Sequence, residues 1–263
     1  MASPIGHNLA GRPSLVAITR RPAATLRLVC VPPAGLGPAF YRTWAEHLPE
    51  TVDLFAVQLP GRGALAEQLC LTDPHEVADR LAEVIHEVDD RRPFALFGHC
   101  VGALLAYATT RVLRRRQHRG PLLLALSAWP APHLDVPIAQ LARVMLAGRA
   151  RLADLYGPIP EELLADPRAM ATAYTPFLAD ILMALQYHQY DEPPLDLPLS
   201  LYGARDDAVF PPEFLHTWSD LSAQPVTPRI FPGSHAYPRD QARELTDRLG
   251  KDLLAARRYA TQP

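Results

Sequence analysis

The stretch Phe94-Ala95-Leu96-Phe97-Gly98-His99-Cys100-Val101-Gly102-Ala103 decides the fold of this chain. An apolar run leads into a tight Gly-x-Cys-x-Gly turn, and a helical pattern then continues to about Arg114. Glycines are needed two positions to either side of the central residue, because larger side chains would collide with the strand or the helix in so sharp a turn. This is the nucleophile-elbow pattern, with cysteine in the position of the usual serine.

Strand and helix patterns alternate along the chain on both sides of this turn. The alternation predicts βαβ units and a mostly parallel sheet flanked by helices. Together with the elbow, it favours the α/β-hydrolase fold. The expected strands are Ser14–Ile18, Leu26–Val31, Asp53–Gln58, Phe94–Phe97, Leu122–Leu126, Leu197–Tyr202 and Val226–Phe231, and the expected helices are Phe40–Leu48, Pro74–Val88, Ala103–Arg114, Pro212–Leu221 and Arg239–Arg257.

One long interval interrupts this rhythm, since residues 136–191 have a helical pattern and no strand. Prolines, among them Pro167 and Pro176, are expected to divide the interval into short helices. An insertion at this point predicts a helical lid over the site, and an extra packing layer without a gating role is the alternative. We therefore expect a flexible leader at 1–13, a core formed by 14–135 and 192–263, and a lid at 136–191.

Composition excludes several classes of protein. The 263 residues are 48% hydrophobic and carry a formal net charge of −2, which offers no basic field for nucleic acid or an anionic membrane. The start, Met1-Ala2-Ser3-Pro4, has no apolar signal region, and no run has the ~20 apolar residues of a membrane span. The three cysteines show no disulfide or zinc spacing. We expect a cytoplasmic protein that uses no cofactor and no metal.

The candidate catalytic residues follow the chain order of an elbow enzyme. Cys100 is the nucleophile, beside a helix start that stabilises a thiolate. His235, on a turn after the last strand, is the expected base, and His99 is interpreted as packing. The acid must lie between nucleophile and base, and the pattern G-x-x-D-x-x-V favours Asp206, with the adjacent Asp207 as the alternative.

The oxyanion needs two backbone donors. The first is the N–H of Val101, directly after the nucleophile. The second must come from the loop after the strand Leu26–Val31, where Pro33 has no N–H, so Ala34 or Gly35 is the candidate. Gly35 could equally be a plain turn glycine.

At these residues the chain resembles the type II thioesterases, the stand-alone editing enzymes of polyketide and nonribosomal peptide assembly lines. The matching stretches lie between residues 26 and 255. Cysteine replaces the family's usual serine, and Ser127 stands where some relatives carry the acid. The matches are 27–35 for the opening strand and oxyanion loop, 56–63 for the loop after the next strand, 98–102 for the elbow, 177–180 and 192–195 for the end of the lid, and 203–209 and 233–237 for the acid and base turns.

The resemblance implies an α/β-hydrolase-fold thioesterase with a Cys-His-Asp triad. Its partner would be an acyl or peptidyl carrier protein with a phosphopantetheine-bound acyl group, released through an acyl-Cys100 intermediate. Cysteine leaves a second outcome open, because an acyl-thioester stays reactive toward an amine, alcohol or carbon nucleophile as well as water. A catalytically weak protein that binds carrier domains is the third hypothesis.

Overall fold

A seven-stranded sheet forms the centre of the chain. The computed structural model describes residues 11–88, 90–134, 139–140, 161 and 165–260. The strand order is β1-β3-β2-β4-β5-β6-β7; β1 pairs antiparallel with β3, and all other pairs are parallel. The predicted mostly parallel α/β fold is confirmed. The strands are β1 Ser14–Ala17, β2 Leu26–Val31, β3 Val52–Gln58, β4 Phe94–His99, β5 Leu124–Ser127, β6 Leu199–Ala204 and β7 Arg229–Phe231.

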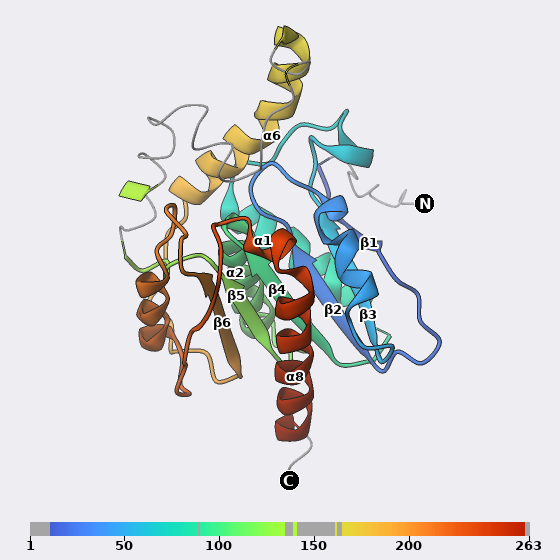
Figure 1. Ribbon diagram of the computed structural model, residues 1–263, viewed down its shortest axis with the longest axis vertical. Helices are drawn as coiled ribbons and strands as arrows, with labels where there is room; N and C mark the ends of the chain where they lie inside the picture. The colour runs from blue at the N-terminus through green and yellow to red at the C-terminus, as the bar shows by residue number, and fades with distance from the viewer. Residues whose placement is uncertain (1–10, 89, 135–138, 141–160, 162–164, 261–263) are drawn as a thin grey trace, which may run out of the picture.

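Helices cover both faces of the sheet (Figure 1). Side chains alternate between the faces along each strand, so Val29 of β2 packs in the core beneath α1 and α2, whereas Leu28 and Cys30 pack in the core beneath η1 and α8. Because both faces are covered, all six residues of β2 and of β4 are buried. The helices are η1 Pro38–Glu46, η2 Gly63–Leu65, α1 Pro74–Glu87, α2 Val101–Arg115, α6 Pro167–Leu185, η3 Pro212–Leu221, α7 Tyr237–Asp240 and α8 Ala242–Ala260.

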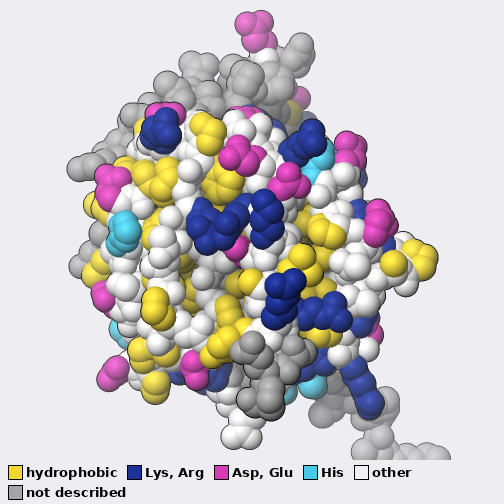
Figure 2. Space-filling view, turned by 60° about the horizontal axis from the view of Figure 1, so that its bottom comes forward, with side chains coloured by type: hydrophobic (Ala, Val, Ile, Leu, Met, Phe, Trp, Pro, Cys, Tyr) yellow, Lys and Arg dark blue, Asp and Glu magenta, His cyan; other side chains and the backbone are white. Residues whose placement is uncertain are grey.

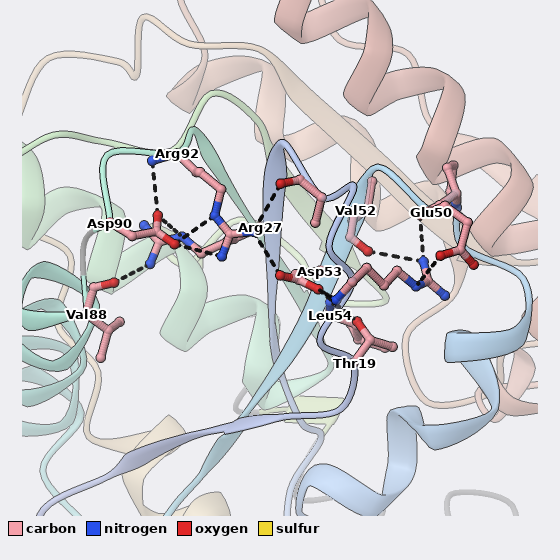
Figure 3. Close-up of polar contacts among 12 residues, drawn as sticks. Thr19, Arg27, Glu50, Val52, Asp53, Leu54, Val88, Asp90 and Arg92 are labelled. Atoms are coloured by element: carbon pink, nitrogen blue, oxygen red, sulfur yellow. Dashed lines mark hydrogen bonds and ion pairs between the residues drawn. The ribbon is translucent and has the colours of Figure 1, made fainter.

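Hydrogen bonds and ion pairs connect the strands at the amino-terminal edge of the sheet, the edge opposite the elbow (Figure 3). Arg27 of β2 is buried, donates to the Val88 carbonyl at 2.6 Å and pairs with Asp90 at 3.4 Å. Arg92 bridges Asp90 and Asp53 of β3, at 2.7 and 2.8 Å. Figure 2 turns this end of the molecule toward the viewer and shows Lys and Arg side chains gathered across it, beside acidic ones. These ion pairs hold the starts of neighbouring strands in register.

Helix α6 differs from the expected short helices. Asp166 caps its start by accepting from the N–H groups of Arg168 and Ala169, and Pro167 occupies the first turn. Pro176 lies inside the helix and does not end it. The missing hydrogen bond is tolerated because the following half of the helix packs on the body of the protein, with Phe177 and Asp180 buried.

The predicted leader and lid are described only in part. Residues 1–10 of the leader, and 136–138, 141–160 and 162–164 of the lid, lie outside the described residues. The carboxyl-terminal part of the predicted lid is α6, which Figure 1 shows at the end of the molecule opposite the carboxyl terminus of α8. No helix in the described part of the chain has the length and apolar character needed to cross a bilayer.

Candidate active site

The turn between β4 and α2 has the strained geometry that the sequence predicts. Cys100 adopts φ 55° and ψ −130°, a conformation that costs free energy for any residue with a side chain. A Cβ on Gly98 would lie 2.1 Å from the Gly102 carbonyl oxygen, and one on Gly102 would lie 2.2 Å from the Val31 carbonyl oxygen. No side chain fits in either place, which confirms the steric reason for both glycines.

Hydrogen bonds of the backbone hold Cys100 in this conformation. Its N–H donates to the Ser127 carbonyl at the end of β5 at 2.9 Å, and its carbonyl accepts from the Ala103 N–H at 2.8 Å. The thiol lies at the start of α2, whose first N–H groups, including that of Val101, have no partner within the helix. This helix end favours negative charge on the sulfur and on a nearby oxyanion.

A buried imidazole and carboxylate lie on the loops that follow β7 and β6. The Nδ1 atom of His235 is 2.7 Å from Oδ2 of Asp207, whose side chain is fully buried. The other carboxylate oxygen accepts the N–H groups of Val209 and Phe210, each at 2.9 Å. Asp206 is exposed. The prediction of Asp206 as the imidazole's partner is therefore wrong, because the turn buries the second of the two carboxylates.

The charge of this imidazole is set by its neighbours. Burial disfavours the protonated ring, but the carboxylate of Asp207 opposes this effect and Cys100 adds to the opposition, so the pKa of His235 is raised from 6.5 to about 10. The other ring nitrogen, Nε2, is buried and makes no well-aligned hydrogen bond within the described part of the chain. The thiol of Cys100 is close enough to the ring to favour its proton. Cysteine, imidazole and carboxylate thus act on one another electrostatically.

The loop after β2 is held by an ion pair that the sequence did not indicate. Asp180 of α6 accepts the Gly35 N–H at 2.7 Å and forms a bidentate pair with Arg62, at 2.5 and 2.7 Å. Arg62 and Asp180 are both buried. Gly35 has φ 75°, and a Cβ there would lie 3.0 Å from Cβ of Phe177. We call the contacts among Gly35, Arg62 and Asp180 the loop clamp. It joins α6 to the candidate oxyanion loop.

The loop clamp corrects one predicted oxyanion donor. The N–H of Gly35 is bonded to the Asp180 carboxylate, so it does not face a substrate carbonyl. The glycine is required instead by its positive φ and by the close approach of α6. The backbone N–H groups of Ala34 and Val101 stay predictions.

A second group of buried polar side chains lies beside the ring of His235. Nδ1 of His99 lies 2.8 Å from the Ser127 hydroxyl, which lies 2.5 Å from the Tyr237 hydroxyl. The ring of His99 packs on the ring of His235, with centroids 4.6 Å apart. His99 therefore makes a hydrogen bond as well as the packing contacts expected of it, and nothing local to the motif reveals partners that are 28 and 138 residues away.

The strained turn lies at the carboxyl ends of the parallel strands, where sheets of this topology carry their functional residues. By fold and by elbow the chain is an α/β hydrolase. Residues 26–253 match the sequence family described as Thioesterase domain. The match covers most of the chain, which therefore belongs to the thioesterase family.

Relatives with a described role support this assignment. The gramicidin S biosynthesis protein GrsT of Aneurinibacillus migulanus is 26% identical over 233 residues, covering 88% of this chain and 90% of the relative. Thioesterase PikA5 of Streptomyces venezuelae is 28% identical, covering 90% and 84%. Among solved structures, YbtT, a type II thioesterase from the yersiniabactin NRPS/PKS biosynthetic pathway, superposes with a TM-score of 0.78 at 29% identity, covering 92% of this chain and 98% of YbtT. RedJ, a thioesterase from the prodiginine biosynthetic pathway of Streptomyces coelicolor, superposes with a TM-score of 0.74 at 31% identity, covering 88% of this chain and 86% of RedJ.

Proposed function

We propose that this enzyme releases acyl groups from the phosphopantetheine thiol of an acyl or peptidyl carrier protein in polyketide or nonribosomal peptide biosynthesis, through an acyl-Cys100 intermediate. The observation that carries the proposal is the placement of Cys100 on the strained elbow beside His235, which is bonded to the buried Asp207. Membership of the thioesterase family and likeness to enzymes named for such pathways support the substrate class.

In the first half of the reaction the Cys100 thiolate attacks the carbonyl carbon of the carrier thioester. The tetrahedral oxyanion is stabilised by the N–H of Val101 and by the start of α2, with Ala34 as the proposed second donor. The intermediate collapses by breaking the bond to the phosphopantetheine sulfur, which leaves with the proton of the His235 imidazolium. The products are acyl-Cys100, a free carrier thiol and a neutral imidazole.

In the second half His235 acts as a base. Acylation removes the charge of Cys100, which is one of the influences that raise the pKa of His235. The pKa of His235 is therefore lower in the acyl-enzyme. The neutral ring takes a proton from water as the water oxygen attacks the acyl carbon. The thiolate leaves, the free acid is released and the imidazolium forms again. Asp207 holds the ring with Nε2 toward the reaction throughout.

A second candidate reaction is acyl transfer to an amine, alcohol or carbon nucleophile, including ring closure within the acyl chain. The specific observation is the sulfur of Cys100. Transfer from one thiol to another changes free energy little, so acyl-Cys100 keeps the activation of the carrier thioester, whereas a serine ester would lose it. A third candidate, a carrier-binding protein with weak catalysis, would not require a buried imidazole–carboxylate pair beside the cysteine.

The experiment that tests the proposal mixes the protein with a panel of acyl thioesters loaded on a carrier protein. Mass spectrometry should find an acyl adduct on Cys100, and none on a folded Cys100→Ala variant. An adduct on another residue would overturn the assignment. Free acid as the product supports hydrolysis, a conjugated or cyclic product supports transfer, and carrier binding without any product supports the third candidate.

The Cys100→Ser variant separates hydrolysis from transfer. Its oxygen ester should remain open to water but react poorly with amines and carbon nucleophiles. If transfer is the natural reaction, the ratio of transferred or cyclised product to free acid should fall in the variant, measured on one substrate with the acceptor saturating. An unchanged ratio would mean that sulfur is not there to preserve acyl activation.

A further inference from the structure

Three buried polar side chains lie next to His235, the proposed base. His99, Ser127 and Tyr237 are each at most 1% exposed, and their polar atoms form a continuous chain, from His99 Nδ1 through the Ser127 hydroxyl to the Tyr237 hydroxyl. The elements that carry them are the same ones that carry the site. His99 precedes Cys100 at the end of β4, Ser127 ends β5, and Tyr237 follows His235 by two residues.

Ser127 touches both halves of the site at once. Its carbonyl accepts the N–H of Cys100 at 2.9 Å, and its hydroxyl contacts Tyr237 at 2.5 Å. A single residue therefore connects the backbone of the nucleophile to the loop that carries the base. The sheet brings the two segments, which are 135 residues apart in the chain, to one edge, and Ser127 adds a direct contact between them there.

The proton positions in this chain follow from the number of donors. Burial raises the pKa of Tyr237, so its hydroxyl stays protonated. Among the described residues, that hydroxyl contacts the Ser127 hydroxyl, which is the natural acceptor for its proton. With Tyr237 as the donor in that contact, the Ser127 proton is left for Nδ1 of His99. Burial and the neighbouring imidazole of His235 lower the pKa of His99 well below its ordinary value, so that ring is neutral. A neutral ring that accepts at Nδ1 carries its proton on Nε2.

A neutral His99 suits its place against the base. The ring of His99 packs on the ring of His235 with centroids 4.6 Å apart, and the edge of Tyr237 packs on His99 at 5.7 Å. A second positive charge at this distance would lower the pKa of His235 and weaken its bond to Asp207. The ring of Phe40 also stacks on the ring of His99, with centroids 6.2 Å apart.

We propose that His99, Ser127 and Tyr237 form a neutral hydrogen-bonded chain that positions the imidazole of His235 relative to Cys100. They are positioning residues: none of the three transfers a proton to the substrate. The inference rests on the proposed function, in which His235 first donates and then accepts a proton, and it assigns the Nε2–H form to His99.

Two replacements of His99 separate positioning from packing. His99→Asn keeps an amide group where Nδ1 stands, so it preserves the bond to Ser127 and loses most of the ring. His99→Phe keeps the ring and loses the bond. For a positioning chain, His99→Asn should retain more activity than His99→Phe, with kcat for His99→Phe reduced about tenfold to a hundredfold and KM nearly unchanged. Equal loss, or better activity from His99→Phe, would overturn the proposal.

Removal of one hydroxyl provides a milder test with a matched control. Tyr237→Phe should lower kcat of the acylation and release steps, and adding Ser127→Ala should cost little more, because the chain acts as a unit. Tyr202→Phe is the control, since Tyr202 is equally buried and loses one hydrogen bond to Asp252, away from the site. If Tyr237→Phe changes kcat no more than Tyr202→Phe does, the hydrogen-bonded chain does not position His235.

A measurement on the unmodified protein is independent of turnover. NMR of ring-¹⁵N-labelled histidine should show His99 as a neutral ring with its proton on Nε2 between about pH 6 and 8. A charged ring, or a proton on Nδ1, would overturn the proposal whatever the variants do. Formation of acyl-Cys100 by the wild type is measured in parallel, so that failure of the proposed function is recognised separately from failure of the chain.

Discussion

The adjacent carboxylates after β6 give the sharpest test of the site. Asp207 is buried, 2.7 Å from His235 Nδ1, and its second oxygen accepts two backbone N–H groups. Asp207→Asn keeps the shape and can keep those two bonds, but its amide donates toward Nδ1 and removes the negative charge. Asp206→Asn changes an exposed side chain next to it and is the matched control.

The magnitude follows from the charge balance at His235. The rise of its pKa from 6.5 to about 10 corresponds to roughly 5 kcal/mol of net interaction with the charged ring. Asp207 is the largest favourable contribution, and burial works against it. Without the carboxylate, the pKa of His235 should fall far below 10 and toward or below 6.5. The Asn amide also imposes the wrong tautomer, a change that costs on the order of 10⁴ in kcat in a Ser-His-Asp site.

The assay measures acyl release from a carrier thioester for both variants, together with the pH at which the His235 ring titrates by NMR. Asp207→Asn should lose roughly 10³- to 10⁴-fold in kcat, and its ring should titrate at a pH lower than in the wild type. Asp206→Asn should stay within about twofold of the wild type, as expected of a surface substitution. A larger loss for Asp206→Asn, or an unshifted titration in Asp207→Asn, would refute the assignment.

Three further outcomes concern stability, measured by urea unfolding. The pKa of His235 is raised in the folded state by its pairing with Asp207. The free energy of unfolding of the wild type should therefore exceed that of Asp207→Asn most below about pH 6.5, and the difference should shrink as the pH rises toward 10. A difference that does not change with pH would contradict this. Asp180→Ala breaks the buried ion pair of the loop clamp and should lower the free energy of unfolding by about 3–5 kcal/mol. Leu178→Ala, at an exposed position on the same helix, should lower it far less. Equal losses would mean that the loop clamp does not stabilise the fold. Gly98→Ala would place its Cβ 2.1 Å from a carbonyl oxygen and should abolish cooperative folding, whereas Gly120→Ala, with nothing within 4 Å, should fold normally; a well-folded Gly98→Ala would contradict the steric account of the elbow.

Features fixed by local sterics could be predicted from the sequence. The conformation of the turn around Cys100 and of the apolar strands is determined by a few neighbouring residues, and β2 begins and ends where expected. The stretches expected to be helical at 40–48 and 212–221 are wound as 3-10 helices instead. Apolar spacing alone does not separate these forms, because 3.0 and 3.6 residues per turn differ little over two or three turns.

Features fixed by distant contacts could not be predicted. Two adjacent aspartates offer no periodic signal, and only the turn that gives Asp207 the N–H groups of Val209 and Phe210 decides which of them is buried. The partner of the Gly35 N–H is Asp180, 145 residues away. Pro176 stops a helix in isolation, but here packing against the body of the protein outweighs the loss of one backbone bond.

The elbow has a consequence for how such an enzyme diversifies. Its shape depends on Gly98, Gly102 and the backbone bonds of residue 100, and none of these interactions uses the sulfur atom. In the proposed reaction, folding therefore depends on the glycines, whereas the product depends on the side chain between them. Each cysteine codon lies one nucleotide from a serine codon, so one mutation at Cys100 would exchange the proposed thioester intermediate for an oxygen ester while the elbow keeps its fold.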